Sequence, residues 1–155
     1  MKTISRALMS ISLAVFAGVS SSCKGEEAKP ETAANPISTV KIRLKIGSKT
    51  FDAKLEDNET AKAFVGMLPL TVKMSDLHRN EKFHRFASGL PTKDANPGMI
   101  HSGDLMIYNS STLVLFYDSF RTSYSYTKLG KLDNPKGLSE ALGSGDVSIT
   151  FEKDS

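Results

Sequence analysis

The sequence has a single cysteine, no tryptophan and no apolar run of the length that a permanent membrane-spanning helix needs. One cysteine excludes a disulfide framework, so burial of apolar side chains must stabilise any folded part. The longest apolar run, residues 7–18, has about a dozen residues, whereas a spanning helix needs about 20. No Gly-x-Ser-x-Gly motif surrounds a serine and no glycine-rich loop precedes a helix, so serine hydrolysis and phosphate binding have no support.

The sequence also lacks a large excess of positive or negative charge. Lys2 and Arg6 belong to the first segment, and without these two of the 20 basic residues, 18 face 17 acidic residues. A nearly neutral chain gives no electrostatic reason to expect a nucleic-acid partner. The three histidines, His78, His84 and His101, lack the spacing of metal ligands. We therefore expect neither a metal site nor a cofactor.

Residues 1–22 have the layout of a secretory signal peptide, with Lys2 and Arg6 before the apolar run. The residues that follow the apolar run, 19–23, are mostly small and end in Cys23. This segment resembles the lipobox of bacterial lipoproteins, although Ser20 stands where leucine is commonest. The resemblance implies lipidation of Cys23 by acyl chains such as palmitate, and a partner that is the membrane itself. We expect a protein anchored to the cell envelope, at the outer membrane, with the leaflet undecided. The alternative is a soluble exported protein that is cleaved after a small residue.

Residues 23–38 are polar and contain Pro30 and Pro36, a composition typical of a flexible tether. The remaining residues, 39–155, have the size of one domain. In it, residues 40–46 alternate apolar and basic side chains, the pattern of a strand with one buried face. Gly47-Ser48-Lys49 then predicts a turn into a second strand over 50–55.

A helix is predicted over residues 60–68, capped by Asn58 or Glu59 and stopped by Pro69. Asn134-Pro135 predicts the start of a second short helix through Leu142. The further strands are predicted over residues 70–77, 81–86, 104–108, 112–117, 124–132 and 147–151. Two helices are too few to serve as crossovers for a βαβ array. The sequence therefore predicts a mainly β protein, an eight-stranded closed or nearly closed antiparallel barrel with two short helices.

Several motifs together resemble the cyclophilin-like family of bacterial barrel proteins, and they extend over nearly all of residues 39–155. They comprise Glu81-Lys82, residues 89–92, 96–100, 102–108, 113–117 and 124–130, and Leu138. The resemblance implies a cyclophilin-type barrel and leaves the activity open, because a fold does not determine the chemistry of its sites.

Phe83-His84-Arg85 is similar to the Phe-His-Arg segment of true cyclophilins, which are prolyl isomerases. In that reading Arg85 would be the catalytic residue. It would hydrogen-bond the proline nitrogen as amide resonance is lost, offsetting part of a barrier of about 18 to 20 kcal/mol. The Gln-Gly-Gly-Asp run of those enzymes is replaced by Pro91-Thr92-Lys93-Asp94, and their Ser-Gln-Phe-Phe strand by a segment such as residues 113–116.

Aromatic side chains are dense between Phe116 and Tyr126. We expect Phe116 and Tyr124 or Tyr126 to fill the barrel. The same segment also offers an aromatic wall with Arg121 and several hydroxyl groups, which suits a peptide, protein or small-molecule ligand. The predicted ligand-binding residues are Phe83, Arg85, Met106, Phe116, Tyr117 and Tyr126. The expected function is a non-enzymatic binding module on the envelope, and the alternative is an extracytoplasmic prolyl isomerase.

Overall fold

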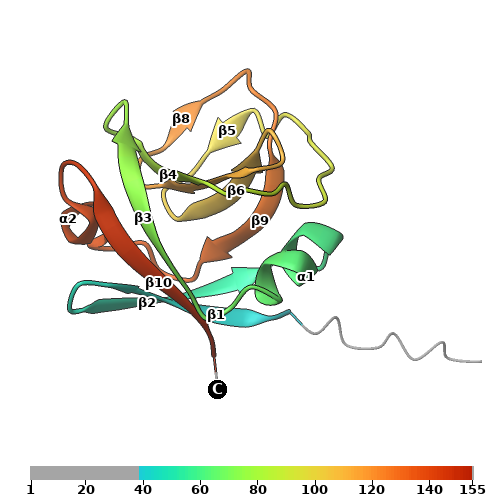
Figure 1. The fold of residues 1–155 in the computed structure, drawn as a ribbon. Coiled ribbons are helices and arrows are strands. Elements are labelled where there is room, and N and C mark those ends of the chain that lie inside the picture. Colours follow the sequence, from blue (N-terminus) through green and yellow to red (C-terminus); the bar gives the residue numbers. More distant parts are fainter. Residues whose placement is uncertain (1–38, 155) are drawn as a thin grey trace, which may run out of the picture. The chain divides into compact units, whose positions relative to one another are not determined.

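A computed structural model describes residues 39–154 of the chain. Eight strands form a barrel, and each keeps within a few residues of its predicted range. They are β1 (Lys41–Ile46), β2 (Lys49–Leu55), β3 (Leu70–Leu77), β4 (Glu81–Arg85), β6 (Asp104–Tyr108), β7 (Thr112–Phe116), β9 (Thr127–Leu132) and β10 (Val147–Lys153). Their order around the closed barrel is β1-β10-β3-β4-β7-β6-β9-β2, and every neighbouring pair is antiparallel (Figure 1). The predicted fold class is confirmed.

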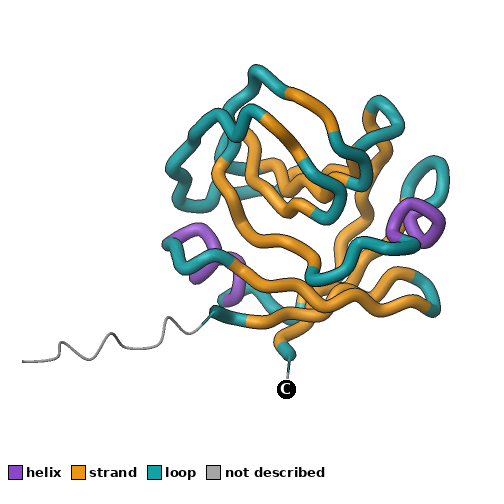
Figure 2. The backbone as a smooth tube through the Cα atoms, turned by 180° about the vertical axis from the view of Figure 1, so that it is seen from behind, coloured by secondary structure: helices purple, strands orange, loops and turns teal. Residues whose placement is uncertain are grey.

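Two short helices lie on opposite sides of the barrel (Figure 2). The first, α1 (Glu59–Val65), is capped by the Asn58 side chain, which accepts a hydrogen bond from the Ala61 amide. The prediction extended this helix to residue 68, before Pro69, but the helix ends at Val65. Gly66 is its C-cap, and the Gly66 amide closes the last turn onto the Lys62 carbonyl. The second, α2 (Leu138–Leu142), begins later than predicted. Neither helix among residues 39–154 is long and apolar enough to cross a membrane.

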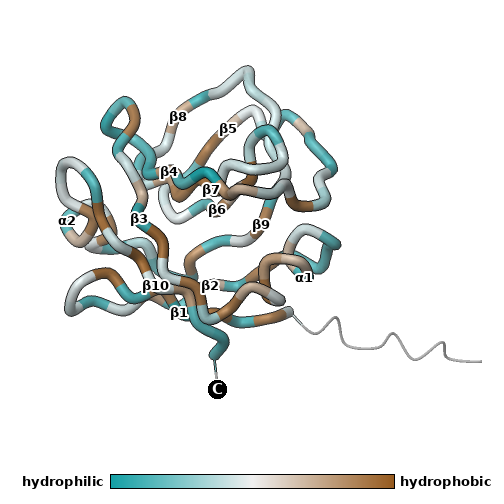
Figure 3. The backbone as a smooth tube through the Cα atoms, in the orientation of Figure 1, coloured by the Kyte–Doolittle hydropathy of each residue, from teal (hydrophilic) through white to brown (hydrophobic). Residues whose placement is uncertain are grey.

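The barrel interior is filled by the alternate apolar residues of its strands. In β1, Ile42, Leu44 and Ile46 are buried, and the basic residues between them face outward. Figure 3 shows the same alternation of hydrophobic and hydrophilic residues along β2 and β10. The helices complete this core. Phe64 of α1 packs edge-on against Phe151, with ring centroids 5.5 Å apart, and the buried residues of α2 join the same cluster.

Gly130 in β9 lets two strands approach closely. A β-carbon at this position would lie 2.4 Å from the Lys54 carbonyl oxygen. The β6–β9 register shifts between Leu105 and Met106, so Leu129 is the extra residue of a β-bulge. This irregularity lies beside the strand end that leads into Tyr126, a residue of the candidate site.

A second layer covers the outer face of β4, β7 and β6. It is a two-stranded sheet of β5 (Met99–Ile100) and β8 (Phe120–Arg121), which lies at the end of the molecule away from β1 and the C-terminus (Figure 1). The sequence reasoning missed both strands, because two-residue strands carry no periodic signal. Beneath them a separate apolar cluster contains Phe116 and Tyr126. The expectation that these two residues fill the barrel is therefore wrong: they are buried on its outside.

Candidate functional site

The outer face of β4 carries three residues of different chemistry. Glu81, Phe83 and Arg85 share this face, because side chains alternate along a strand. Their partners across the ladder on β7 are Phe116, Val114 and Thr112, respectively. The register therefore sets an acid, an aromatic ring and a base in a row beside the apolar outer face of the barrel.

A groove with a cavity of about 510 Å³ lies over this row. One wall comes from β4 and the end of β3, and the other from residues 120–124, which belong to β8 and the loop after it. Its aromatic lining consists of Phe83, Tyr108, Phe120, Tyr124 and Tyr126. A concave, largely aromatic surface with a few polar groups is the usual form of a ligand site.

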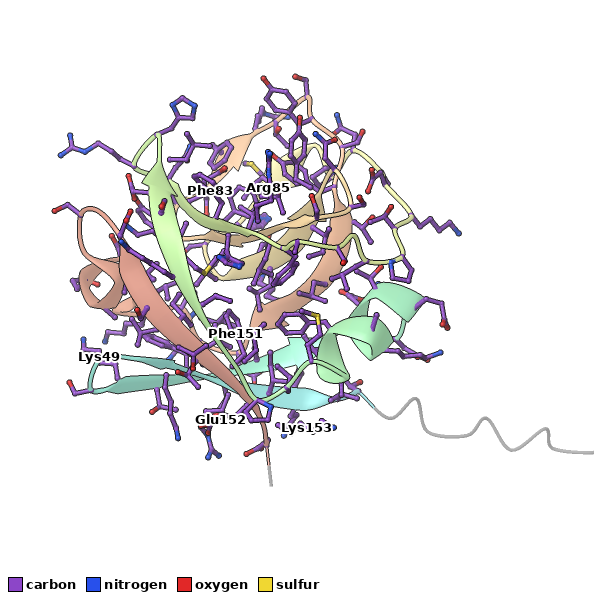
Figure 4. The ribbon with its side chains drawn as sticks, in the orientation of Figure 1. Lys49, Phe83, Arg85, Phe151, Glu152 and Lys153 are labelled. Atoms are coloured by element: carbon purple, nitrogen blue, oxygen red, sulfur yellow. The ribbon has the colours of Figure 1, made fainter. Side chains whose placement is uncertain are left out.

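Arg85 lies on the rim of this groove. Its side chain is exposed, and it forms no ion pair with any residue in the described part of the chain. Figure 4 shows Phe83 and Arg85 close to each other, at the end of the molecule opposite Glu152 and Lys153. The guanidinium group is thus free to donate hydrogen bonds to a ligand in the groove.

Tyr126 connects the buried cluster with the open groove. Its ring packs against Phe116 and Tyr108, with centroids 5.6 Å and 5.5 Å away. Tyr108 in turn meets Tyr124, which is 62% exposed and overhangs the rim. The rings therefore form a continuous series from the protein interior to the solvent, and this series fixes the shape of the groove.

Glu81 is the least favourably placed charge of the site. Burial raises the pKa of its carboxyl group to about 7, and the negative charge of Asp76 adds to the rise. The pKa of Tyr126 is also raised, by burial first and then by the nearby Glu81 carboxylate. Glu81 has no hydrogen-bond or ion-pair partner among residues 39–154. It is a half-buried acid without a counter-ion.

The inner side of the same strand carries a closed polar network. Lys82 is fully buried, and its amine donates to Asp76 Oδ1 at 2.8 Å and to the carbonyl oxygens of Gly143 and Gly145. The Tyr117 hydroxyl donates to the same Asp76 oxygen at 2.6 Å. The Lys82 and Tyr117 hydrogen bonds lower the pKa of Asp76, while burial and Asp76 raise the pKa of Tyr117 to about 12. This network fastens the loop after α2 to the barrel.

A second cavity, of about 840 Å³, lies between α1 and residues 91–97. Tyr126 and Met106 line it, and Tyr126 also lines the groove over β4. The bridge between Ala95 and Tyr126 holds the loop in place there. Tyr126 therefore stands between two hollows on the same side of the barrel.

The structure brings three of the six predicted ligand-binding residues, Phe83, Arg85 and Tyr126, to the groove. Met106 lies on the other side of Tyr126, at the second cavity. Phe116 is fully buried beneath Phe120, and the Tyr117 hydroxyl is bonded to Asp76 away from the groove lining. Cys23 lies outside the described residues.

The sequence reasoning did not select Asn80, Glu81 or Tyr108, which also line the groove. The alternation in residues 81–85 could have indicated Glu81, because it shares a strand face with Phe83 and Arg85. Among residues 39–154, no three histidine, cysteine, aspartate or glutamate side chains come together as a metal site would require.

This architecture is shared with known proteins. The model of the cyclophilin-like family matches residues 44–152, which include every strand around the groove. The chain belongs to the cyclophilin-like family. The predicted family is thus confirmed, and so is the barrel that goes with it. The solution structure of a hypothetical protein from Archaeoglobus fulgidus has a similar fold, with a TM-score of 0.53 and 17% sequence identity over 75% of this chain and 95% of that one. This likeness concerns the fold alone. None of the curated proteins with which the sequence was compared matches it.

Proposed function

We propose that the protein is a peptide-binding module whose site is the groove over the outer face of β4. The observation that carries this proposal is the position of Arg85, an exposed and unpaired base at the rim of an aromatic groove. Aromatic rings supply apolar contact, while Arg85 and the hydroxyls of the facing loop offer hydrogen bonds to peptide carbonyls. The volume of about 510 Å³ accommodates a few residues of an extended segment.

A second candidate function is prolyl isomerisation, and the same residue favours it. The reaction needs an N–H donor that reaches the proline nitrogen while the ring is held against an apolar surface. Arg85 supplies the donor and Phe83, two residues before it on the same strand face, supplies an apolar ring. The mismatched segments noted in the sequence leave binding without catalysis as the first proposal.

One experiment separates the two functions. Proline-containing peptides are added to residues 24–155, and both binding and the rate of cis-to-trans exchange are measured by NMR. Binding without acceleration is the expected result and supports the binding module. Acceleration that is lost in Arg85→Ala supports the isomerase. The control is Arg79→Asn, which removes a nearby exposed base outside the groove lining and suits the left-handed backbone at that position. Absence of binding to every peptide would refute both functions.

We further propose that the chain is anchored to the cell envelope through lipidated Cys23. The lipobox-like segment before Cys23 and the polar residues after it support this placement. Cys23→Ser, expressed in a bacterium that processes lipoproteins, should move the protein from the membrane fraction to the soluble one. Ser21→Ala, which keeps a small residue in the segment, should stay with the membrane. Retention of Cys23→Ser in the membrane fraction would contradict the anchor.

A further inference from the structure

We propose that the groove selects ligands with a positive charge and holds their ammonium or guanidinium group at its Glu81 end. The inference rests on the proposed binding function and names the ligand class: a peptide that carries a lysine or arginine side chain. Three features of the groove support it, namely an acid without a counter-ion, a neighbouring oxygen without a hydrogen-bond partner, and the separation of opposite charges along the strand.

The first feature is Glu81 itself. It lies directly opposite the buried Phe116 in the β4–β7 register, and it shares the groove lining with Phe83, Phe120 and Tyr126. A partly buried carboxylate is costly unless a cation or hydrogen-bond donors meet it, and the described part of the chain provides neither. A ligand ammonium group would supply both the charge and the donors.

The second feature is the side chain of Asn80, the neighbour of Glu81. Its Oδ1 atom is enclosed and is the one buried side-chain polar atom without a hydrogen-bond partner among residues 39–154. The backbone of Asn80 is held on both sides, since its amide donates to Leu77 and its carbonyl accepts from the Tyr117 amide. An enclosed acceptor without a donor is rare in folded proteins and is energetically unfavourable. Asn80 lines the groove, so a rotation of its side chain would turn this oxygen toward a ligand N–H group.

The third feature is the arrangement of charge along β4. Glu81 and Arg85 share one strand face and are four residues apart, which corresponds to about 13 Å. Phe83 lies between them on this face, and this separation is too long for an ion pair. The groove therefore has an acceptor end and a donor end. A basic side chain fits the first, and the carbonyl oxygens of the same peptide fit Arg85 at the second.

The aromatic lining is compatible with a cation at the Glu81 end. Tyr126 lies close enough for the Glu81 charge to raise its pKa, so its ring and the carboxylate face the same space. A cation over an aromatic face is attracted by the ring in addition to its ion pair. Arg121, which also lines the groove, comes from β8 on the opposite wall.

The test uses two proline-containing peptides that differ only in one side chain, lysine in the first and norleucine in the second. Residues 24–155 are titrated with each peptide by calorimetry. We expect the lysine peptide to bind roughly tenfold more tightly, the size of one charge-assisted contact. In Glu81→Gln the two peptides should bind with nearly equal affinity. Glu140→Gln removes an acid on α2 outside the groove, and this variant should keep the preference for the lysine peptide.

The outcomes are distinct. Equal binding of the two peptides by the unaltered protein would overturn the charge selection and leave the binding function standing. Binding of neither peptide would overturn both. A preference that survives Glu81→Gln would show that another group holds the cation, and it would refute the assignment to Glu81.

Proton linkage provides a second readout. Since the pKa of Glu81 is raised to about 7, the preference for lysine should grow as the pH rises from 6 to 8, when the carboxyl group loses its proton. The other ionisable groups around it are Asp76 on β3, His78 in the following turn, Arg85, Tyr108, Arg121, Tyr124 and Tyr126. All of them remain in Glu81→Gln, so a pH dependence that persists in that variant would contradict the role of Glu81.

Discussion

Lys82 and Glu81 are neighbours in β4 and point to opposite faces of the barrel wall. The charge of Lys82 is paired within residues 39–154, whereas that of Glu81 is not. The buried amine of Lys82 has three oxygen partners, one of them the carboxylate of Asp76. The half-buried carboxyl group of Glu81 has none in the described part of the chain. A charge taken out of water is tolerated when the protein pairs it, and it is costly when the protein does not. The inner face is thus complete in itself, whereas the outer face has groups that a ligand could meet.

Removal of the Lys82 amine should have the largest effect on stability. In Lys82→Met the carboxylate of Asp76 loses its cation, and the carbonyl oxygens of Gly143 and Gly145 lose a donor. We expect the free energy of unfolding to fall by about 2 to 4 kcal/mol, because breaking a buried pair leaves an uncompensated charge. Urea denaturation followed by circular dichroism measures this loss.

The matched control for this prediction is Lys45→Met. Lys45 also pairs with a carboxylate, that of Glu152 at 2.8 Å, but the Lys45 side chain is exposed and that of Glu152 is partly exposed. Its loss should cost no more than about 1 kcal/mol. Equal losses in Lys82→Met and Lys45→Met would contradict the contrast between a buried network and the protein surface.

Tyr117→Phe should have an intermediate effect. It removes the hydroxyl that donates to Asp76 at 2.6 Å and keeps the ring, so we expect a loss of about 1 kcal/mol at neutral pH. The pKa of Asp76 is lowered, first by Lys82 and then by Tyr117, so this contribution is present above about pH 4. It is lost as the pH falls through the lowered pKa of the folded protein. Unfolding curves of the two proteins should therefore converge in acid; a constant difference at every pH would argue against the bond to Asp76.

Glu81→Gln should have the smallest effect on stability, and one of opposite sign. The pKa of Glu81 is raised in the folded protein, so the folded state binds the proton more tightly than the unfolded chain. Stability should therefore fall as the pH rises from about 4.5 to about 7, by about 1 kcal/mol or less after allowance for solvent screening. The variant lacks this decline and should be the more stable protein at pH 8. Parallel pH profiles for the two proteins would show that Glu81 carries no such strain.

The inner and outer faces of the barrel also differ in how well their buried residues can be predicted from the sequence. The barrel interior follows from alternation, as in Ile42, Leu44 and Ile46, because each strand has one continuous buried face. Alternation does not predict the apolar cluster on the outside of the barrel. Phe116 is buried and aromatic, which predicts a place in the core, but its burial depends on β5 and β8, strands of two residues each.

The sequence predicts only part of the candidate site, because motifs can be read from it but burial and pairing cannot. Phe83 and Arg85 were selected from their motif, and Tyr126 from the density of aromatic residues, and all three line the groove. Glu81 was missed because its importance comes from burial and from the lack of a counter-ion, and neither property can be read from a sequence. Met106 and Tyr117 have suitable chemistry, but Met106 lines the second cavity and the Tyr117 hydroxyl is bonded to Asp76.

The most direct test of the account is to locate the binding site by NMR. Residues 24–155, labelled with ¹⁵N, are titrated with a peptide that contains both proline and lysine, and the amide shifts are mapped onto the barrel. The account predicts that the largest changes fall in residues 77–85, 108–114 and 120–126, which surround the groove. Changes confined to α1 and residues 91–97, or no change at all, would contradict it.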